Sequence, residues 1–215
     1  RENASNVSCG RFESSTKLIL NFYYKDFKMT KEHEIIFAGF GGQGVLSMGK
    51  LIAYAGMIEG KEVSWMPSYG PEMRGGTANC TVIVSDSRIS SPMISVFDTA
   101  ILLNQPSIDK FEKTVKPGGL LIYEQSTAVH PPTRTDIEIV CIAGNEEATK
   151  LNAKQVANMF MVGAFLEKRP IIKVETLIEA LKKALPPRRH NLIPMNELAL
   201  ARGKELVKLA DQVSA

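Results

Sequence analysis

Two glycine-rich stretches hold the residues of this chain that are best suited to chemistry. The first, residues 39–44, reads Gly-Phe-Gly-Gly-Gln-Gly and matches the pattern G-x-G-x-x-G. It follows an apolar run and precedes a segment with helical spacing. Glycines permit a tight turn, and a helix N-terminus presents unpaired N–H groups to an anion. The candidate binding residues of this loop are Gly39, Gly41, Gly42, Gln43 and Gly44.

This glycine loop is open to three interpretations. Binding of NAD or FAD requires an acidic residue about 20 positions further on, at the end of the second strand, to hold the ribose hydroxyl. Glu59 and Glu62 have that spacing, but both precede the apolar part of the second predicted strand, which ends in Trp-Met-Pro. The sequence therefore favours a phosphate or other anion site without NAD. A purely structural tight turn is the third interpretation.

The second stretch, residues 68–77, reads Ser-Tyr-Gly-Pro-Glu-Met-Arg-Gly-Gly-Thr. Glycine and proline make it irregular, and it carries one carboxylate, Glu72, and one guanidinium, Arg74. A guanidinium donates two parallel hydrogen bonds to a phosphate or a carboxylate, so we expect Arg74 to bind an anion and Glu72 to orient it. A Glu72–Arg74 pair on a surface connector is the simpler alternative. The candidate residues are Ser68, Tyr69, Glu72, Arg74, Gly75, Gly76 and Thr77.

Alternating apolar runs and helical patterns predict the elements that position both loops. Strands are expected at 34–39, 62–66, 78–85, 99–104, 120–123 and 137–142. Helices are expected at 42–59, 106–115, 152–168, 174–184 and 195–211. Several predicted strands are apolar throughout, a pattern that is typical of strands buried on both faces of a sheet. The predicted fold class is α/β, a three-layer α/β/α arrangement with a mostly parallel, Rossmann-like sheet and a helical C-terminal part. Both loops are then expected at one edge of the sheet, where such sheets bind ligands.

The first 28 residues differ in composition from the rest. Serine, asparagine and isolated charges dominate up to Thr16, and a short apolar run follows. Met29 stands directly before the first good strand, so we interpret residues 1–28 as a disordered N-terminal extension. Residues 29–215 are expected to form a single α/β domain.

Composition narrows the class of protein. At 44% apolar and 23% charged residues, with a net charge of only +3, the chain offers no electrostatic basis for binding nucleic acid or an anionic membrane. No apolar stretch approaches the roughly 20 residues of a membrane span. The three cysteines, Cys9, Cys80 and Cys141, include no CxxC pair, which argues against a zinc or iron–sulfur site in this chain. We interpret Cys80 and Cys141 as buried free thiols and expect a cytoplasmic protein.

Three other groups of polar residues are weaker candidates. The histidines His33, His130 and His190 are scattered and read as solvated loop residues. Asn104 and Gln105 follow a strand, where they fit either a cleft wall or a helix cap. The run 188–190, Arg-Arg-His, fits a phosphate contact, but an exposed basic turn is the favoured interpretation.

Together the two loops resemble the γ subunit, or the equivalent domain, of the 2-oxoacid:ferredoxin/flavodoxin oxidoreductases. The matching segments are 38–44, 67–77, 99–105 and 116–119, followed by Asn158-Met159, Gly163-Ala164, Asn191 and the terminal helix up to Gly203. The resemblance runs in order over roughly residues 33–205, and the second loop is most similar to that of the 2-oxoglutarate and branched-chain members.

The resemblance implies a role within a larger enzyme. Such enzymes convert a 2-oxoacid, here expected to be 2-oxoglutarate, and coenzyme A to an acyl-CoA and carbon dioxide while reducing ferredoxin. Thiamine diphosphate, Mg²⁺ and iron–sulfur clusters are implied for partner subunits of the α, β and δ types, with none held by this chain alone. The γ part is implied to help enclose the active site and CoA. The isolated chain is therefore expected to be inactive, with a free-standing NAD- or FAD-dependent oxidoreductase as the alternative.

Overall fold

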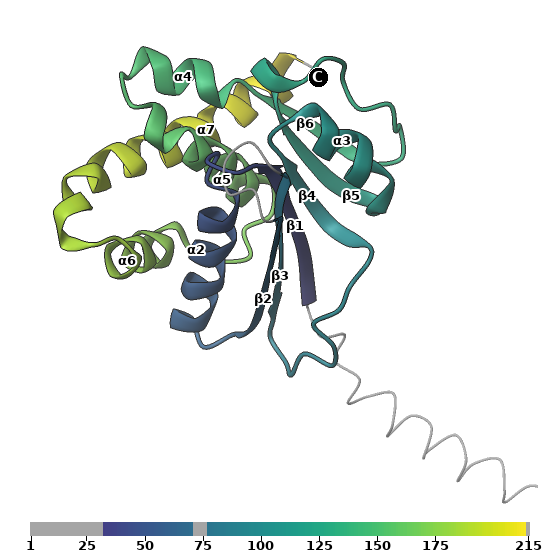
Figure 1. The fold of residues 1–215 in the computed structure, drawn as a ribbon, viewed down its shortest axis with the longest axis horizontal. Coiled ribbons are helices and arrows are strands. Elements are labelled where there is room, and N and C mark those ends of the chain that lie inside the picture. Colours follow the sequence, from purple (N-terminus) through teal and green to yellow (C-terminus); the bar gives the residue numbers. More distant parts are fainter. Residues whose placement is uncertain (1–31, 71–76, 214–215) are drawn as a thin grey trace, which may run out of the picture. The chain divides into compact units, whose positions relative to one another are not determined.

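A six-stranded sheet lies at the centre of the computed structural model, which describes residues 32–70 and 77–213 (Figure 1). The strands are β1 (Glu32–Phe40), β2 (Glu62–Tyr69), β3 (Thr77–Ser85), β4 (Phe97–Leu102), β5 (Val115–Glu124) and β6 (Glu138–Ile142). Their order across the sheet is β2-β3-β1-β4-β5-β6. Strands β1, β4, β5 and β6 are parallel neighbours, which confirms the mostly parallel sheet expected from the apolar runs.

Strand β3 is the exception, because it runs antiparallel to both β2 and β1. Residues 70–76 between β2 and β3 are too few for the crossover of a dozen or more residues that joins parallel neighbours. The two strands therefore form a hairpin, a pairing that the strand patterns alone did not predict. Since β2 is an edge strand, Pro67 remains within it, although proline was expected to end the strand.

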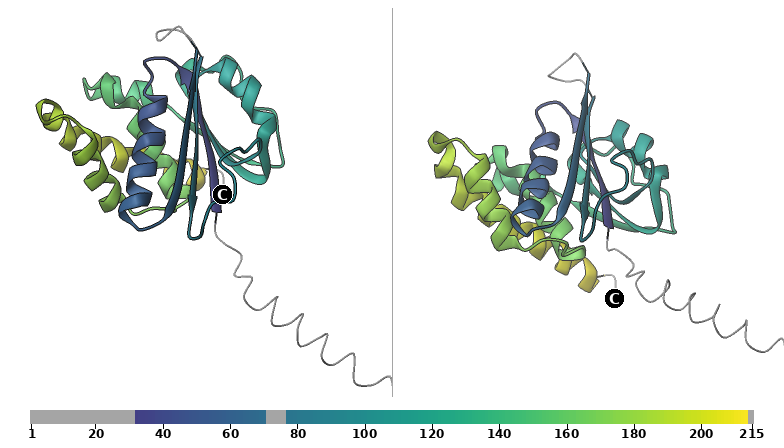
Figure 2. Two further views of the ribbon diagram at one scale, coloured as in Figure 1. Left: turned by 60° about the horizontal axis from the view of Figure 1, so that its bottom comes forward. Right: turned by 90° about the horizontal axis from the view of Figure 1, so that it is seen from below.

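Helices surround the sheet unequally. They are α2 (Val45–Ile58), α3 (Gln105–Phe111), α4 (Gly144–Lys150), α5 (Ala157–Lys168), α6 (Val174–Ala184) and α7 (Ile193–Val213), with short 3₁₀ helices η1 (Glu112–Thr114), η2 (Gln125–Thr127), η3 (Lys154–Val156) and η4 (Pro187–Leu192). Helices α2 and α5 pack on one face, with α6 and α7 outside them, and α3 packs on the other face (Figure 2). The expected three layers are present.

Two apolar clusters follow from this arrangement, because successive strand residues point to opposite faces. Ile35 and Phe37 of β1 belong to the large core beneath α2 and α5. Ile36 and Ala38 belong to the smaller core on the α3 side. Both faces of the central strands are therefore buried, which explains why those strands are apolar throughout.

The helical C-terminal part differs from the expectation in two places. The short helix α4 was not predicted, and the helix expected at 152–168 is divided into η3 and α5. Helix α4 has seven residues, and only Gly144 and Ala148 are buried, so it leaves no helical apolar stripe in the sequence. The helix expected at 174–184 is found with those bounds.

Helices α5 and α7 cross with their backbones in contact. A Cβ atom added at Gly163 would lie 2.2 Å from the Leu200 carbonyl oxygen, and one added at Gly203 would lie 2.1 Å from the Phe160 carbonyl oxygen. Only glycine has room at either position. The crossing packs α7 against α5 and so completes the large core beneath them.

Two side-chain environments differ from the sequence interpretation. Cys80 is fully buried as expected, but Cys141 is exposed because it lies on the edge strand β6. His33 is not a solvated loop residue: it lies in β1, its Nε2 is 3.0 Å from the Thr99 hydroxyl, and its ring packs near Phe165. In the part of the chain that the structure describes, no helix is long and apolar enough to cross a membrane.

The half-buried ring of His33 predicts a pH dependence of stability. The pKa of His33 is lowered from 6.5 to about 4, chiefly by burial, which the carboxylate of Asp98 opposes and the nearby cations Arg169 and Lys116 reinforce. Because the unfolded histidine binds a proton more readily than the folded one, the stabilisation is complete above about pH 6.5 and is lost as the pH falls towards 4. We expect this loss to be at most about 3 kcal/mol.

Urea unfolding at several pH values measures this effect. His33→Gln should flatten the pH dependence of the unfolding free energy between pH 4 and 6.5 relative to that of the parent chain. Parallel pH profiles for the parent chain and His33→Gln would contradict the prediction.

Candidate functional site

The glycine loop lies at the point where the helices that follow neighbouring strands pack on opposite faces of the sheet. Adjacent parallel strands β1 and β4 are followed by α2 and α3, which cover opposite faces of the sheet. Open α/β sheets bind ligands in the crevice outside the carboxyl ends of the strands at such a point. The sequence placed the loop at a strand-to-helix junction, and the fold places that junction at the expected edge.

The loop itself is a tight turn that leads directly into α2. Gly42 and Gly44 have φ values of 98° and 82°, which favour glycine. Gly44 is the N-cap residue of α2 and supplies no side-chain hydrogen bond, so the first N–H groups of this 14-residue helix have no side-chain cap. Such a helix end attracts negative charge.

Gln43 was predicted to bind a ligand, but its side chain is occupied within the protein. Its Oε1 accepts a 2.6 Å hydrogen bond from the Phe40 amide, and its Nε2 donates a 3.0 Å bond to the Leu103 carbonyl oxygen. Leu103 directly follows β4. Gln43 therefore joins the loop after β1 to the end of β4.

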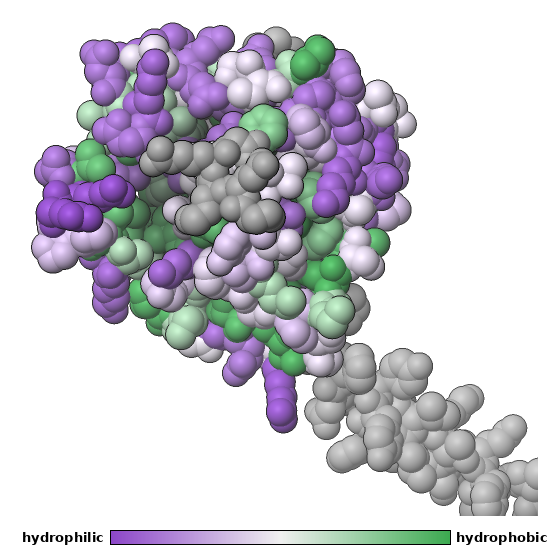
Figure 3. Space-filling view, in the orientation of Figure 1, coloured by the Kyte–Doolittle hydropathy of each residue, from purple (hydrophilic) through white to green (hydrophobic). Residues whose placement is uncertain are grey.

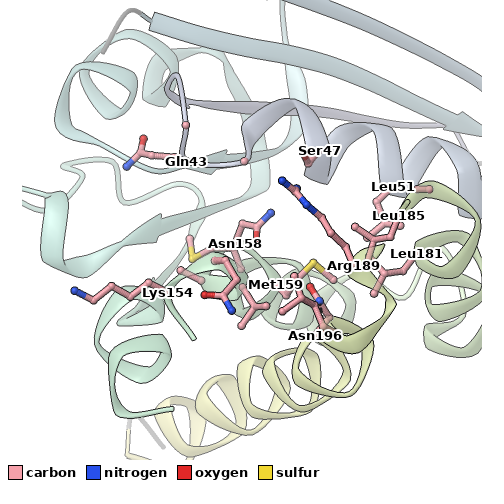
Figure 4. Close-up of a pocket in the computed structure, with 18 of the residues that line it drawn as sticks. Gln43, Ser47, Leu51, Lys154, Asn158, Met159, Leu181, Leu185, Arg189 and Asn196 are labelled. Carbon is pink, nitrogen blue, oxygen red and sulfur yellow. Dashed lines mark hydrogen bonds between the residues drawn. The ribbon is translucent and has the colours of Figure 1, made fainter. Parts of the chain in front are cut away.

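A cleft of about 630 Å³ opens beside this loop (Figure 4). Three cationic side chains line it: Lys50 from α2, Lys154 from η3 and Arg189 from η4. Arg189 extends from η4 towards the start of α2, where Ser47 also lines the cleft. The cleft thus combines an uncapped helix N-terminus with three positive charges, a setting suited to a phosphate-rich ligand.

The opposite part of the cleft is apolar. Its lining includes Leu51 of α2, Met159 of α5 and Leu181 of α6, together with Leu185 between α6 and η4. Hydrophilic residues gather over α4 and the α6–η4 side of this face of the molecule (Figure 3). The cleft therefore suits a ligand that has both an anionic part and an apolar or aromatic part.

One carboxylate, Glu124, lies in the cleft wall at the end of β5. It is almost fully buried, and burial raises its pKa, although hydrogen bonds from Ser126, Asn145 and Gly144 oppose the rise. Its Oε1 accepts from the Ser126 amide and hydroxyl, and its Oε2 accepts from the Asn145 amide at the start of α4. Glu124 therefore holds η2 and α4 in place beside the cleft.

The remaining predicted residues are placed as follows. Gly42, Gln43 and Gly44 line the cleft, whereas Gly39 and Gly41 do not. Ser68 and Tyr69 end β2 and Thr77 begins β3; all three are exposed, and none lines the cleft. Since Phe40 pairs with Thr77 and Tyr69 with Ala78, both glycine-rich stretches meet one edge of the sheet, as expected. Glu72, Arg74, Gly75 and Gly76 lie outside the described residues.

The three cationic residues of the cleft are not among the binding residues that the sequence predicts. Arg189 belongs to the basic run that the sequence predicts to be exposed; it is exposed, and it also lines the cleft. No sequence motif points to Lys50 or Lys154. Asn104 caps α3 by accepting a 2.9 Å bond from the Ser107 amide, which favours the capping alternative. Among residues 32–70 and 77–213, no group of three His, Cys, Asp or Glu residues could hold a metal ion.

Comparison with known sequences gives matches over most of the chain. It is 37% identical over 175 residues to the ketoisovalerate oxidoreductase subunit VorA of Methanothermobacter thermautotrophicus, covering 81% of this chain but only 36% of that protein. It is 30% identical over 181 residues to the 2-oxoglutarate synthase subunit KorC of Methanothermobacter marburgensis, covering 81% of this chain and 96% of that protein. The chain thus spans about a third of the VorA relative and nearly all of the KorC relative.

Solved structures agree with the sequence matches. The keto/oxoacid ferredoxin oxidoreductase γ subunit of Geobacter sulfurreducens superposes with a TM-score of 0.70 at 26% identity, covering 82% of this chain and 99% of that one. The 2-oxoglutarate:ferredoxin oxidoreductase of Magnetococcus marinus, solved with 2-oxoglutarate, coenzyme A and succinyl-CoA bound, gives a TM-score of 0.76 at 26% identity, covering 83% of this chain and 31% of that one. The model of the pyruvate ferredoxin/flavodoxin oxidoreductase family matches residues 34–206. With these matches in sequence and fold, the chain belongs to the pyruvate ferredoxin/flavodoxin oxidoreductase family.

Proposed function

We propose that the chain is the γ component of a thiamine-diphosphate-dependent 2-oxoacid:ferredoxin oxidoreductase and that its cleft binds coenzyme A. The whole enzyme would convert a 2-oxoacid and CoA to an acyl-CoA and carbon dioxide, passing the electrons released to oxidised ferredoxin. The observation that carries the CoA assignment is the cleft itself, whose lining includes an uncapped helix N-terminus, three cationic residues and an apolar wall.

The chemistry of CoA fits this division of the cleft. Its phosphates match the glycine loop, Lys50, Lys154 and Arg189, because N–H groups and cations both stabilise phosphate oxygens. Its adenine ring or pantetheine arm matches the apolar wall formed by α2, α5 and α6. A relative of the same fold has been solved with CoA bound, which supports this choice of ligand.

The other cofactors are assigned to partner subunits in this proposal. Thiamine diphosphate binds through Mg²⁺, which prefers carboxylate and carbonyl oxygens, and iron–sulfur clusters require several cysteine thiolates. The sequence has only three cysteines, widely spaced. Partners of the α, β and δ types would hold these groups, and Arg74 would face an anion at the boundary with them.

The 2-oxoacid in the proposal is 2-oxoglutarate, with ketoisovalerate as the second candidate. The KorC relative, a subunit of 2-oxoglutarate synthase, spans nearly the same length as this chain. The VorA relative has the higher identity, 37%, but only about a third of its length is covered. Assaying the assembled enzyme against 2-oxoglutarate, ketoisovalerate and pyruvate would decide between them.

The topology disfavours the alternative of a free-standing NAD or FAD enzyme. In a dinucleotide-binding sheet the ribose-binding acid ends a parallel strand next to β1. Here β3 separates β1 from β2, and β2 ends in the exposed residues Ser68 and Tyr69. The loop therefore lacks the partner strand that the NAD interpretation needs.

Arg189→Ala tests the CoA assignment directly. Loss of a hydrogen-bonded cation should weaken CoA binding by about tenfold to a hundredfold, equivalent to about 1.5 to 3 kcal/mol. Isothermal titration of the full chain with CoA measures this, and Arg189→Lys should restore part of the affinity. Arg188→Ala is the matched control, because Arg188 is the neighbouring arginine and does not line the cleft. Equal affinities for the Arg189→Ala and Arg188→Ala chains would contradict the assignment.

A further inference from the structure

We propose that Gln43 is a positioning residue, which holds the glycine loop in its anion-binding conformation without contacting the anion. Both ends of its side-chain amide are engaged within the protein: Oε1 with the Phe40 amide and Nε2 with the Leu103 carbonyl oxygen. In the close-up of the cleft its side chain points away from Arg189 and Ser47 (Figure 4). This inference rests on the proposed CoA site.

The first contact closes the turn on itself. The backbone N–H of Gln43 donates to the Phe40 carbonyl oxygen at 3.2 Å, and the backbone N–H of Phe40 donates to the side-chain Oε1 of Gln43 at 2.6 Å. The two bonds run in opposite directions between the same two residues. They fix the backbone from the end of β1 to the residue that precedes the α2 cap.

The second contact fixes the turn to the rest of the sheet. The Leu103 carbonyl oxygen accepts from Gln43 Nε2 and also from the Thr127 hydroxyl, at 3.0 and 2.7 Å. Thr127 ends η2, which Glu124 holds through Ser126. One carbonyl oxygen therefore links the segments that follow β1, β4 and β5. The first two contribute Gly42, Gln43, Gly44 and Leu103 to the cleft lining, and the last residue of β5, Glu124, also lines it.

Gly39 provides the space for this arrangement. A Cβ atom at Gly39 would lie 2.7 Å from Gln43 Oε1 and 3.0 Å from Leu103 Cβ. Both distances are shorter than ordinary van der Waals contact, so a larger residue would displace the Gln43 side chain. The first glycine of the motif is thus explained by the need to admit Gln43 rather than by contact with a ligand.

The energetic role of the Gln43 contacts is preorganisation. A loop with four glycines loses much backbone freedom when it is fixed, and that cost would otherwise be met when the ligand binds. Hydrogen bonds that hold the loop beforehand lower the cost of binding. Removal of the Gln43 contacts should therefore weaken binding even though no ligand contact is lost.

Gln43→Met tests the inference, because methionine has similar length and no amide. In the full chain without ligand, hydrogen exchange of the backbone amides at positions 40 and 43 should become at least about tenfold faster, while exchange in the buried part of β1 stays unchanged. CoA affinity should fall about tenfold. Thr127→Val is the control, since it removes the other donor to Leu103 but leaves both Gln43 contacts, and the loop should stay protected.

Gln43→Glu adds a readout that a merely structural role would not give. The ionised carboxylate has no donor for the Leu103 carbonyl oxygen, whereas the protonated form has both a donor and an acceptor. Its CoA affinity relative to the parent chain should be about tenfold lower at about pH 8 and should recover towards about pH 4, as the carboxyl group gains its proton.

The outcomes separate this inference from the proposed function. If the parent chain does not bind CoA, the proposed ligand is wrong, and the exchange measurement without ligand still tests Gln43. If Gln43→Met keeps the loop as protected as in the parent chain, or if Gln43→Glu shows no pH-dependent recovery, the positioning role is overturned. Failure of both variants to fold would also overturn it, because Gln43 would then be part of the structural core.

Discussion

Gly203→Ala is expected to destabilise the chain by about 2 kcal/mol or more. The added methyl group would lie 2.1 Å from the Phe160 carbonyl oxygen on α5, so the two helices must move apart. Overpacking of this kind costs about 1 to 3 kcal/mol and occasionally more, and a backbone atom yields less easily than a side chain. Alanine favours a helix over glycine by about 1 kcal/mol, which offsets part of the loss.

Thermal unfolding of the full chain measures this effect, and Gly163→Ala should behave similarly because it meets the Leu200 carbonyl oxygen at 2.2 Å. Gly70→Ala is the matched control: the same methyl group is added where no other atom of residues 32–70 and 77–213 lies within 4 Å, chain neighbours aside. Equal midpoints for the Gly203→Ala and Gly70→Ala chains would show that α5 and α7 do not pack as closely as described.

Gly44→Val is expected to weaken CoA binding at least about a hundredfold. Gly44 has a φ of 82°, which costs a residue with a Cβ about 1 to 2 kcal/mol. Its Cβ would also lie 2.6 Å from Nδ2 of Asn158, which lines the cleft. Both effects shift the N–H groups at the start of α2. A hundredfold loss of CoA affinity corresponds to about 3 kcal/mol of binding free energy.

The control for Gly44→Val is Gly60→Val, at the other end of α2. Gly60 has a φ of 74°, so valine meets similar backbone strain. In the described part of the chain, no atom beyond its chain neighbours lies within 4 Å of its Cβ position, and Gly60 does not line the cleft. Both variants should lose stability in urea unfolding. Only Gly44→Val should lose CoA affinity in calorimetry, and a similar loss in both would place the effect in the fold rather than in the loop.

The sequence was informative where a local pattern decides the structure. The apolar runs of β1, β4 and β5 and the glycine stretch at 39–44 have a short-range physical cause, since buried strands must be apolar and a tight turn needs glycine. The Rossmann-like, mostly parallel sheet and the junction of β1 with α2 were therefore predictable. The sequence prediction did not include the hairpin of β2 and β3, although the short connection between these two strands implies it.

The cleft was harder to predict because residues far apart in the chain build it. Lys50, Lys154 and Arg189 come from α2, η3 and η4, and no short motif links them. Gln43 is the converse case, because its place in a binding motif suggests a ligand contact, whereas we infer a positioning role. Its partner, the Leu103 carbonyl oxygen, is 60 positions away, so only the fold shows that the side chain is already occupied.

The most direct test of the central claim is to purify the chain from cells and to measure which subunits accompany it and what reaction the preparation catalyses. A tagged full chain, expressed in its native cells, should bring down two or three partner subunits with iron–sulfur absorbance. That preparation should reduce a viologen dye only when both a 2-oxoacid and CoA are added, and the chain alone should not. A chain that purifies without partners and catalyses dye or NAD reduction by itself would contradict the account.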